Sequence, residues 1–276
     1  MKILIAAVIL IIVFLLYENT RISVSRYRVT CRSLPKEFRG FRIVHLSDLH
    51  TKRFGKNYSR LVDRVAPLHP DIIFFTGDLI SRNEKKYAHK VLLMKRLMEI
   101  APVYYSLGNH EVDNRELTEK LAEKLIEEGV HVLVNSKEIL TRESAQIEIY
   151  GLALESYFFK NPTGDFKQLP PVTKAEITEL CGKKTDNMFS VLLAHSPLPF
   201  SEYEKWGADI VFSGHMHGGI IRIPFTKRGL LSPERKFFPD FTEGVFRKFG
   251  ANMVVSRGLG KLRILNPSEI VLVSLK

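Results

Sequence analysis

Five short clusters of polar residues in this chain carry side chains that can bind divalent metal ions. They offer carboxylate, amide and imidazole donors without a thiolate, which favours Mn, Fe or Zn over calcium. A single Asp or His after a strand is usually a turn residue or a helix cap, but five such clusters in series indicate a shared site. The clusters contain Asp48 and His50, Asp78, Asn109 and His110, His195, and His215 and His217.

The last cluster lies in the stretch SGHMHGGII at residues 213–221, where glycines flank a His-x-His pair. In an extended chain, residues i and i+2 project to the same side, so we expect both histidines to address one site. Asp48 and His50 repeat this spacing. A flexible surface turn is the alternative, but such a turn gains nothing from two imidazoles. The flanking glycines would permit sharp turns and close backbone approach to ions or substrate; they are Gly214, Gly218 and Gly219.

Short apolar runs precede these clusters and predict the elements that position them. Their β-branched and aromatic residues are typical of buried strands, and the segments between the first runs have apolar residues at helical spacing. Alternating strands and helices predict an α/β layered domain with its polar clusters at the carboxyl ends of the strands. The expected strands are 41–46, 71–76 and 102–107, then a second set at 146–152, 190–194, 209–212, 252–255 and 269–275; the helices are 58–68, 84–100 and 114–128.

The N-terminal residues have the pattern of a membrane segment or a secretory signal. Residues 3–17 read ILIAAVILIIVFLLY, near the lower end of the ~17 to 25 residues that span a bilayer. A removed signal peptide would end in a small-residue cleavage site, which this run lacks. We therefore expect a retained single-pass anchor in the cell membrane over residues 1–20, with an uncleaved or unusual signal as the alternative.

Basic residues after this segment favour a cytoplasmic catalytic domain; they are Arg21, Arg26, Arg28, Arg32 and Lys36. We expect a basic juxtamembrane linker at residues 21–40 and one catalytic domain at 41–276.

Composition narrows the class of protein. The 276 residues, 45% of them hydrophobic, suffice for one sizeable α/β core. The formal net charge of +11 indicates anionic partners, among which nucleic acid, lipid headgroups and nucleotides stay open. Cys31 and Cys181 have no C-x-x-C companion, which excludes a zinc ribbon and a disulfide framework.

The ordered motifs D-x-H, G-D, G-N-H-E, an isolated His and G-H-x-H resemble those of the calcineurin-like metallophosphoesterases. The match runs from about Phe41 to Lys276. The resemblance implies a sandwich of two sheets flanked by helices. The N-terminal apolar segment and the stretch SRGLG at residues 256–260 resemble the membrane-anchored bacterial branch. That branch often has Thr and Gln where this chain has Met216 and Ile220, which bears only on fine substrate contacts.

The resemblance also implies two divalent metal ions bridged by Asp78. One ion would be held by Asp48, His50, Asp78 and His217, and the other by Asp78, Asn109, His195 and His215. Two divalent ions against two carboxylates leave a formal charge of roughly +2, which favours hydroxide and phosphate together in the site. His110 would act as general acid or stabilise the leaving oxygen.

These expectations describe a membrane-anchored phosphoesterase that uses a metal-activated hydroxide on a phosphodiester or pyrophosphate bond. Segments 155–172 and 220–249 combine aromatic and basic residues, which suits a lipid phosphate or a nucleic acid. The expected anchor favours a lipid-linked or nucleotide-sugar substrate over nucleic acid. A nuclease and a non-catalytic scaffold of the same fold are the alternatives. The scaffold is disfavoured because all eight site residues are present.

Overall fold

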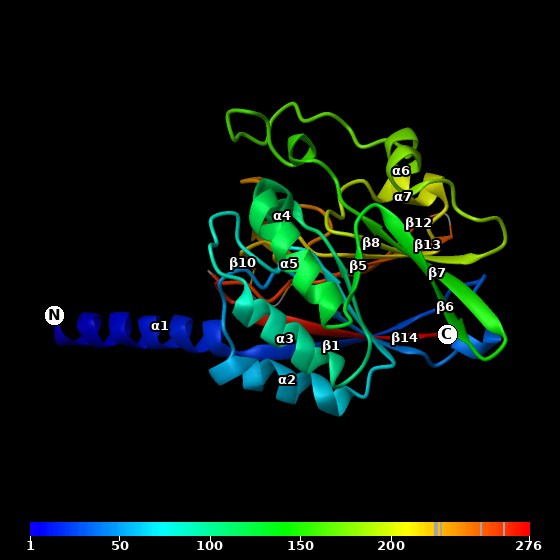
Figure 1. Cartoon of the computed structure of the whole chain (residues 1–276). Coiled ribbons are helices and arrows are strands. Elements are labelled where there is room, and N and C mark those ends of the chain that lie inside the picture. Colours follow the sequence, from blue (N-terminus) through cyan, green and yellow to red (C-terminus); the bar gives the residue numbers. More distant parts are fainter. Residues whose placement is uncertain (224–225, 227, 249, 262) are drawn as a thin grey trace.

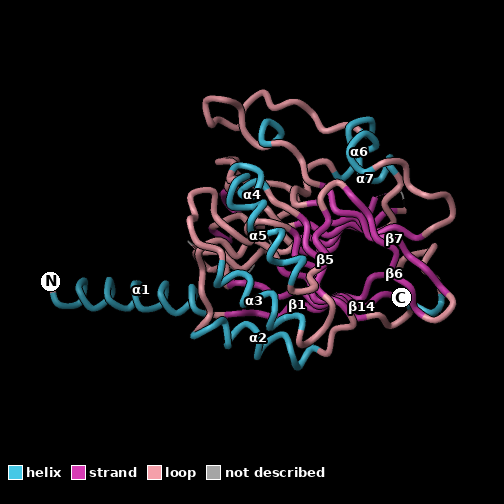
Figure 2. Tube along the Cα trace, viewed as in Figure 1, coloured by secondary structure: helices cyan, strands magenta, loops and turns pink. Residues whose placement is uncertain are grey.

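The computed structural model describes residues 1–223, 226, 228–248, 250–261 and 263–276. Two six-stranded sheets lie at the centre of the body of the protein, with helices outside them (Figures 1 and 2). The first sheet has the order β1 (Ile22–Val29), β14 (Ser268–Leu275), β2 (Arg42–Leu46), β3 (Ile72–Thr76), β4 (Val103–Ser106) and β5 (His131–Leu133). The second has the order β12 (Gly244–Lys248), β13 (Ala251–Val255), β9 (Ile210–Ser213), β8 (Phe189–Ala194), β7 (Ala145–Leu152) and β6 (Ser136–Arg142). A small antiparallel pair, β10 (Ile221–Arg222) and β11 (Gly229–Leu231), stands apart from both.

Helices cover the outer faces of both sheets. The α-helices are α1 (Lys2–Thr20), α2 (Ser59–Val65), α3 (Ala88–Met98), α4 (Asn109–Asp113), α5 (Arg115–Glu127), α6 (Lys174–Cys181) and α7 (Phe200–Trp206). Short 3-10 helices are η1 (Lys36–Phe38), η2 (Lys56–Tyr58), η3 (Ala66–Leu68) and η4 (Ser156–Phe158). Residues of α2, α3 and α5 pack on the first sheet, whereas residues of α6 and α7 pack on the second.

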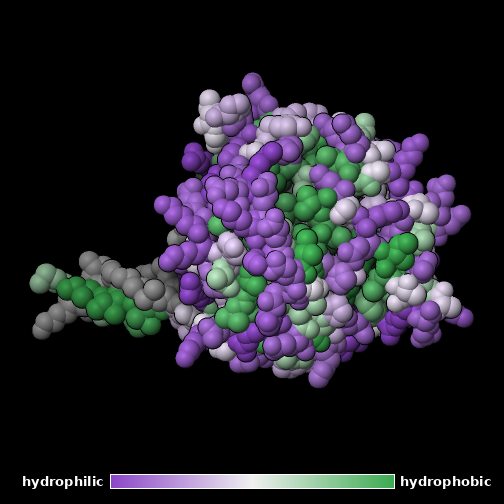
Figure 3. Space-filling view, viewed as in Figure 1, coloured by the Kyte–Doolittle hydropathy of each residue, from purple (hydrophilic) through white to green (hydrophobic). Residues whose placement is uncertain are grey.

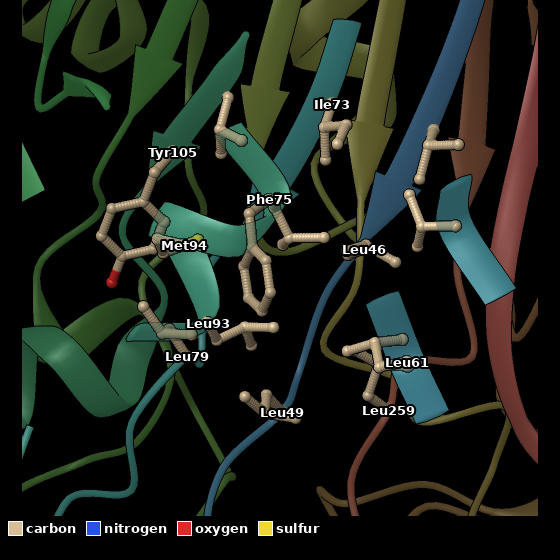
Figure 4. Close-up of a cluster of buried hydrophobic side chains, with 14 of the residues drawn as sticks. Leu46, Leu49, Leu61, Ile73, Phe75, Leu79, Leu93, Met94, Tyr105 and Leu259 are labelled. Carbon is tan, nitrogen blue, oxygen red and sulfur yellow. The ribbon is translucent and has the colours of Figure 1, made fainter. Parts of the chain in front are cut away.

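Alternating side chains of the central strands supply two different cores, because successive residues of a strand point to opposite faces. Phe75 of β3 packs with Leu93 of α3 in the cluster under the helices (Figure 4). Its neighbour Phe74 points the other way, where its ring lies 5.0 Å from that of Phe212 on β9. The strands are thus buried on both faces, which explains their almost unbroken apolar sequence.

The expected α/β architecture of two sheets with flanking helices is confirmed, but two segments differ from expectation. Residues 269–275 were assigned to the second set of strands, whereas β14 lies in the first sheet between β1 and β2. Residues 22–29 were expected within a linker, yet β1 pairs in parallel with β14 from Ile22 opposite Ser268 to Val29 opposite Leu275. Arg26 and Arg28 interrupt the apolar pattern of this edge strand and concealed it.

Helix α1 extends away from the body of the protein (Figure 1). Apolar side chains lie open on its surface, in contrast to the largely hydrophilic face of the body (Figure 3). They include Ile5, Ile9, Leu10, Val13 and Phe14, which are 44–69% exposed. Within the described residues, no helix has both the length and the apolar composition needed to cross a membrane. The single-pass anchor at residues 1–20 therefore stays a prediction.

Candidate metal centre

The site residues predicted from the sequence follow β2, β3, β4, β8 and β9; all lie in loops except Asn109 and His110, which begin helix α4. Four of these residues converge on one point. A donor atom of each of Asp48, His50, Asp78 and His217 lies within 4.8 Å of those of the other three. His217 Nε2 is 3.2 Å from Asp48 Oδ1 and 3.2 Å from His50 Nε2. This group is the ligand set that the resemblance implies for the first ion.

The remaining predicted ligands lie beside this group. His195 Nε2 is 3.3 Å from Asp78 Oδ2, and His215 Nδ1 is 3.1 Å from Asn109 Oδ1. The same Asp78 oxygen lies 3.7 Å from His50 Nε2. The Asp78 carboxylate thus faces histidines of both expected ligand sets.

The backbone reaches this arrangement through left-handed conformations rather than through extended chain. The φ angles are 54° at Asp48, 50° at His50, 67° at His215 and 50° at His217. The expectation that each i, i+2 pair lies in extended chain is therefore wrong. Such conformations cost of order 1–3 kcal/mol each for residues with a Cβ and persist where the surrounding structure enforces them. Both pairs still deliver their side chains to one site.

At Gly214 the backbone of the His-x-His loop lies close to the loop that carries Asp48, whereas the expected close approach to an ion or substrate stays a prediction. A Cβ added there would lie 1.9 Å from Ser47 Oγ and 2.4 Å from Asp48 Oδ2. The Asp48 carboxylate also accepts from the backbone N–H of His215, at 3.1 and 3.2 Å. Glycine at this position therefore lets the two ligand loops touch.

The buried imidazole of His195 tests whether the site suits a cation. Its Nδ1 lies 2.7 Å from the carbonyl oxygen of Thr76, so Nδ1 carries a proton and donates it. Its Nε2 is buried, has no hydrogen-bond partner among the described residues and faces the Asp78 carboxylate. Burial alone would lower the pKa of His195, but Asp78 and then Asp48 outweigh burial and raise this pKa to about 10. The Asp78 carboxylate at 3.3 Å thus favours a positive charge at Nε2, either a proton or a metal ion, and the donor set fits a metal.

The two carboxylates keep their negative charge despite full burial. Burial raises the pKa of Asp48, yet His217 and His195 hold it well below its usual range. His195 and His110 have the same effect on the pKa of Asp78. Burial lowers the pKa of His50 to about 3, so this imidazole is neutral. Two carboxylates and a neutral imidazole are a suitable donor set for a divalent ion.

His110 lies at the edge of a cavity of about 410 Å³ that opens onto the ligand cluster. Its Nδ1 accepts from the backbone N–H of Arg82 at 3.1 Å, and its Nε2 is 3.8 Å from Asp78 Oδ2. The Arg82 guanidinium lies 3.3 Å from the same Nε2. Burial lowers the pKa of His110, and the Asp78 carboxylate opposes this shift. His110 and Arg82 thus present an imidazole and a cation to a group in the cavity; its other lining residues include Phe166, Ile220, Pro233 and Lys261.

Two supporting carboxylates were not recognised from the sequence. Glu111, fully buried, accepts backbone N–H bonds from Asp78 at 2.7 Å and from Gly108 at 2.8 Å, and so joins two ligand loops. Burial and then the charge of Asp78 raise the pKa of Glu111 to about 7. Glu111 is the last residue of the G-N-H-E motif, so its place in that motif could have identified it as a residue of the site.

Glu234 is the second supporting carboxylate. Its Oε1 lies 3.3 Å from His215 Nε2, an arrangement that orients the imidazole of a metal-binding histidine. It lies in the segment 220–249, far from any motif, and no local spacing in the sequence indicated it.

The family model described as calcineurin-like phosphoesterase matches residues 41–219, well over half of the chain. The chain belongs to this family. Membership, together with relatives named as a phosphodiesterase and a pyrophosphatase, makes the protein a metal-dependent hydrolase. A cluster able to hold a divalent ion lies within the matched region.

Several relatives of this phosphoesterase align over most of its length. Metallophosphoesterase YkuE of Bacillus subtilis is 26% identical, covering 94% of this chain and 87% of its own. Phosphodiesterase YaeI of Escherichia coli is 28% identical, and the alignment covers 80% of this chain and 76% of YaeI. UDP-2,3-diacylglucosamine pyrophosphatase LpxG of Chlamydia trachomatis is 27% identical, and the alignment covers 87% of this chain and 86% of LpxG.

The solved structure of phosphopantetheinyl hydrolase (PptH) from Mycobacterium tuberculosis has a similar fold. Its TM-score is 0.50 at 16% identity, over 81% of this chain and 91% of that chain. This likeness supports the metallophosphoesterase fold of the chain.

Proposed function

We propose that this phosphoesterase hydrolyses a phosphodiester or pyrophosphate bond at a centre of two divalent metal ions. The observation that carries the proposal is the placement of Asp78. One of its carboxylate oxygens faces histidines of both expected ligand sets at 3.3 and 3.7 Å, beside a cavity lined by His110 and Arg82. A carboxylate can bridge two cations about 3.5 to 4 Å apart, the spacing used in two-metal phosphoryl transfer.

The proposed ligands are those named from the sequence. Asp48, His50, Asp78 and His217 would hold one ion, and Asp78, Asn109, His195 and His215 the other. Oxygen and nitrogen donors suit Mn, Fe or Zn. When bound, such ions supply positive charge that lowers the pKa of water and neutralises phosphoryl oxygens.

The protein's own groups then have distinct tasks. The His110 imidazole, whose Nδ1 accepts from the Arg82 backbone N–H, would use its Nε2–H to donate a hydrogen bond that stabilises the leaving oxygen. The Arg82 guanidinium is positioned to bind a phosphoryl oxygen. Glu234 keeps the His215 ring oriented, and Glu111 fixes the Asp78 and Gly108 loops relative to each other.

We further propose a lipid-linked or nucleotide-sugar substrate and attachment to the cell membrane through α1, with the catalytic domain on the cytoplasmic side. The exposed apolar side chains of α1 and the name of the relative LpxG, a pyrophosphatase of a diacylated nucleotide sugar, support this view. Arg21 directly follows α1 and would face anionic headgroups.

A panel assay tests the reaction. Full-length protein loaded with Mn²⁺ should hydrolyse bis-para-nitrophenyl phosphate and a lipid-linked pyrophosphate, and Asp48→Ala should abolish both activities. Cleavage of DNA in preference to both compounds would replace the proposal with a nuclease. Absence of any hydrolysis by a fully metallated protein would refute it.

Membrane attachment has a separate test. Full-length protein should sediment with membranes after a high-salt wash, and deletion of residues 1–17 should release it. This deletion keeps Asn19, whose side chain donates to the Arg263 carbonyl oxygen at 2.9 Å. Recovery of the full-length chain in the supernatant would contradict the proposal.

A further inference from the structure

A second cavity of about 580 Å³ lies where α1 meets the catalytic body. We call it the foot cavity; it is lined by Asn19, Thr51, Lys52, Arg53 and Lys261. Thr51 and Lys261 also line the metal cavity, so the two spaces adjoin. A molecule bound at the metal ligands can therefore extend into the foot cavity without leaving the protein surface.

The lining of the foot cavity is strongly basic. Three of its five residues are Lys or Arg, and no carboxylate is among them. The ammonium of Lys52 is buried and donates to backbone and Ser268, so the charge at the surface of the cavity comes from Arg53 and Lys261. Arg53 and Lys261 are exposed, and within the described part of the chain neither forms an ion pair with a carboxylate. Unpaired cations that line a concave surface concentrate anions there.

The backbone around Lys261 is held in place from two sides. Buried Lys52 donates to the carbonyl oxygen of Gly260 at 3.2 Å and to Ser268 Oγ at 2.6 Å. Buried Arg263 donates to the carbonyl oxygen of Gly260 at 2.8 Å. The residue that precedes Lys261 is thus fixed in position.

Gly260 also lies against the metal centre. A Cβ added there would be 3.1 Å from His50 Cδ2 and 3.1 Å from the carbonyl oxygen of Asp48. Lys261 therefore directly follows a residue that packs against His50 and Asp48, two proposed ligands, and it lies at the boundary of the two cavities.

We propose that the foot cavity binds a second phosphate group of the substrate, next to the phosphoryl group that is cleaved. This inference rests on the proposed function and adds a feature to the substrate: it carries two anionic groups, one at the metal centre and one between Arg53 and Lys261. Because the foot cavity is lined by Asn19 of α1, the second phosphate lies on the side from which α1 leaves the body.

A matched pair of soluble substrates tests the inference. One is the para-nitrophenyl ester of thymidylate, and the other is the same ester with a phosphate on the remaining sugar hydroxyl. With Mn²⁺-loaded full-length protein, the phosphorylated ester should have the higher kcat/KM, chiefly through a lower KM. We expect a preference of about tenfold for one well-placed charge-assisted contact.

Variants then assign the preference to the foot cavity. Arg53→Ala and Lys261→Ala should each reduce the ratio of the two kcat/KM values, and the double variant should bring it close to one. Lys261→Arg should retain the preference because it keeps the charge. Lys183→Ala, an exposed lysine away from both cavities, is the matched control and should leave the ratio unchanged.

The source of the phosphate is distinguished by inhibition. If the second phosphate belongs to a lipid, phosphatidate in phosphatidylcholine vesicles should inhibit more strongly than the same concentration of glycerol phosphate. Stronger inhibition by glycerol phosphate would assign the second phosphate to a soluble molecule. Equal kcat/KM for the two esters in the wild type, or a preference that survives in Arg53→Ala/Lys261→Ala, would overturn the inference while leaving the phosphoesterase proposal intact. Failure to cleave either ester by the metallated protein would instead remove the proposed function and this inference with it.

Discussion

Replacement of Gly214 by alanine tests whether contact between the two ligand loops shapes the centre. The added Cβ would lie 1.9 Å from Ser47 Oγ, whereas Cβ atoms rarely come within 3.0 Å of another atom. Ser47 is buried and donates to the Thr76 carbonyl oxygen at 2.9 Å, so it has little room to move. Overpacking costs about 1–3 kcal/mol and a displaced hydrogen bond about 1 kcal/mol. Gly214→Ala should therefore lower the free energy of unfolding by about 2–4 kcal/mol.

The double variant Ser47→Gly/Gly214→Ala separates stability from metal binding. Removal of the Ser47 side chain relieves the closest contact but not the loss of its hydrogen bond to Thr76, so urea denaturation in the presence of a chelator should show part of the stability restored. The contact of the new Cβ with Asp48 Oδ2, at 2.4 Å, remains. Calorimetric titration with Mn²⁺ should still show weakened binding. Wild-type stability and wild-type metal affinity in the single variant would refute the argument.

Three further outcomes follow from the site. His110→Ala should keep both metals but slow turnover by about two to four orders of magnitude; metal loss with a normal rate per occupied site would contradict that role. Glu234→Gln should weaken the binding of one Mn²⁺ ion by about tenfold or more, as measured by titration calorimetry. Equal Mn²⁺ affinities of the variant and the wild type would show that Glu234 does not orient His215. Burial lowers the pKa of His45 to about 3, so the unfolded chain binds its proton first as the pH falls below 6.5. Through this group, the free energy of unfolding from denaturant titrations should be about 1 kcal/mol lower at pH 5.5 than at pH 6.5, and His45→Gln should remove that difference.

The ligand positions could be predicted because each follows an apolar strand, and parallel strands place their carboxyl ends together. Asp48, Asp78 and Asn109 follow neighbouring strands of the first sheet, while His195 and His215 follow neighbouring strands of the second. What the spacing could not supply was the backbone conformation. The i, i+2 pairs use left-handed residues, which local spacing does not indicate.

Features that depend on contacts between residues far apart in the chain could not be predicted from local sequence patterns. β1 carries arginines among its apolar residues, and only its pairing with β14 makes it a strand. Glu234 reaches His215 from a loop without a motif. The foot cavity needs α1 beside the segment that contains Lys261, and nothing in the local sequence of either element indicates that they meet.

Metal content of the Asp78→Ala variant tests the central claim most directly. Wild-type protein equilibrated with excess Mn²⁺ and passed through a desalting column should retain two ions per chain by mass spectrometry. Because one carboxylate serves both ions, Asp78→Ala should lose both, whereas a centre without a bridge would lose one at most. Asp165→Ala, in an exposed loop, provides the control and should keep the wild-type content. Two ions per chain in folded Asp78→Ala protein would contradict the account.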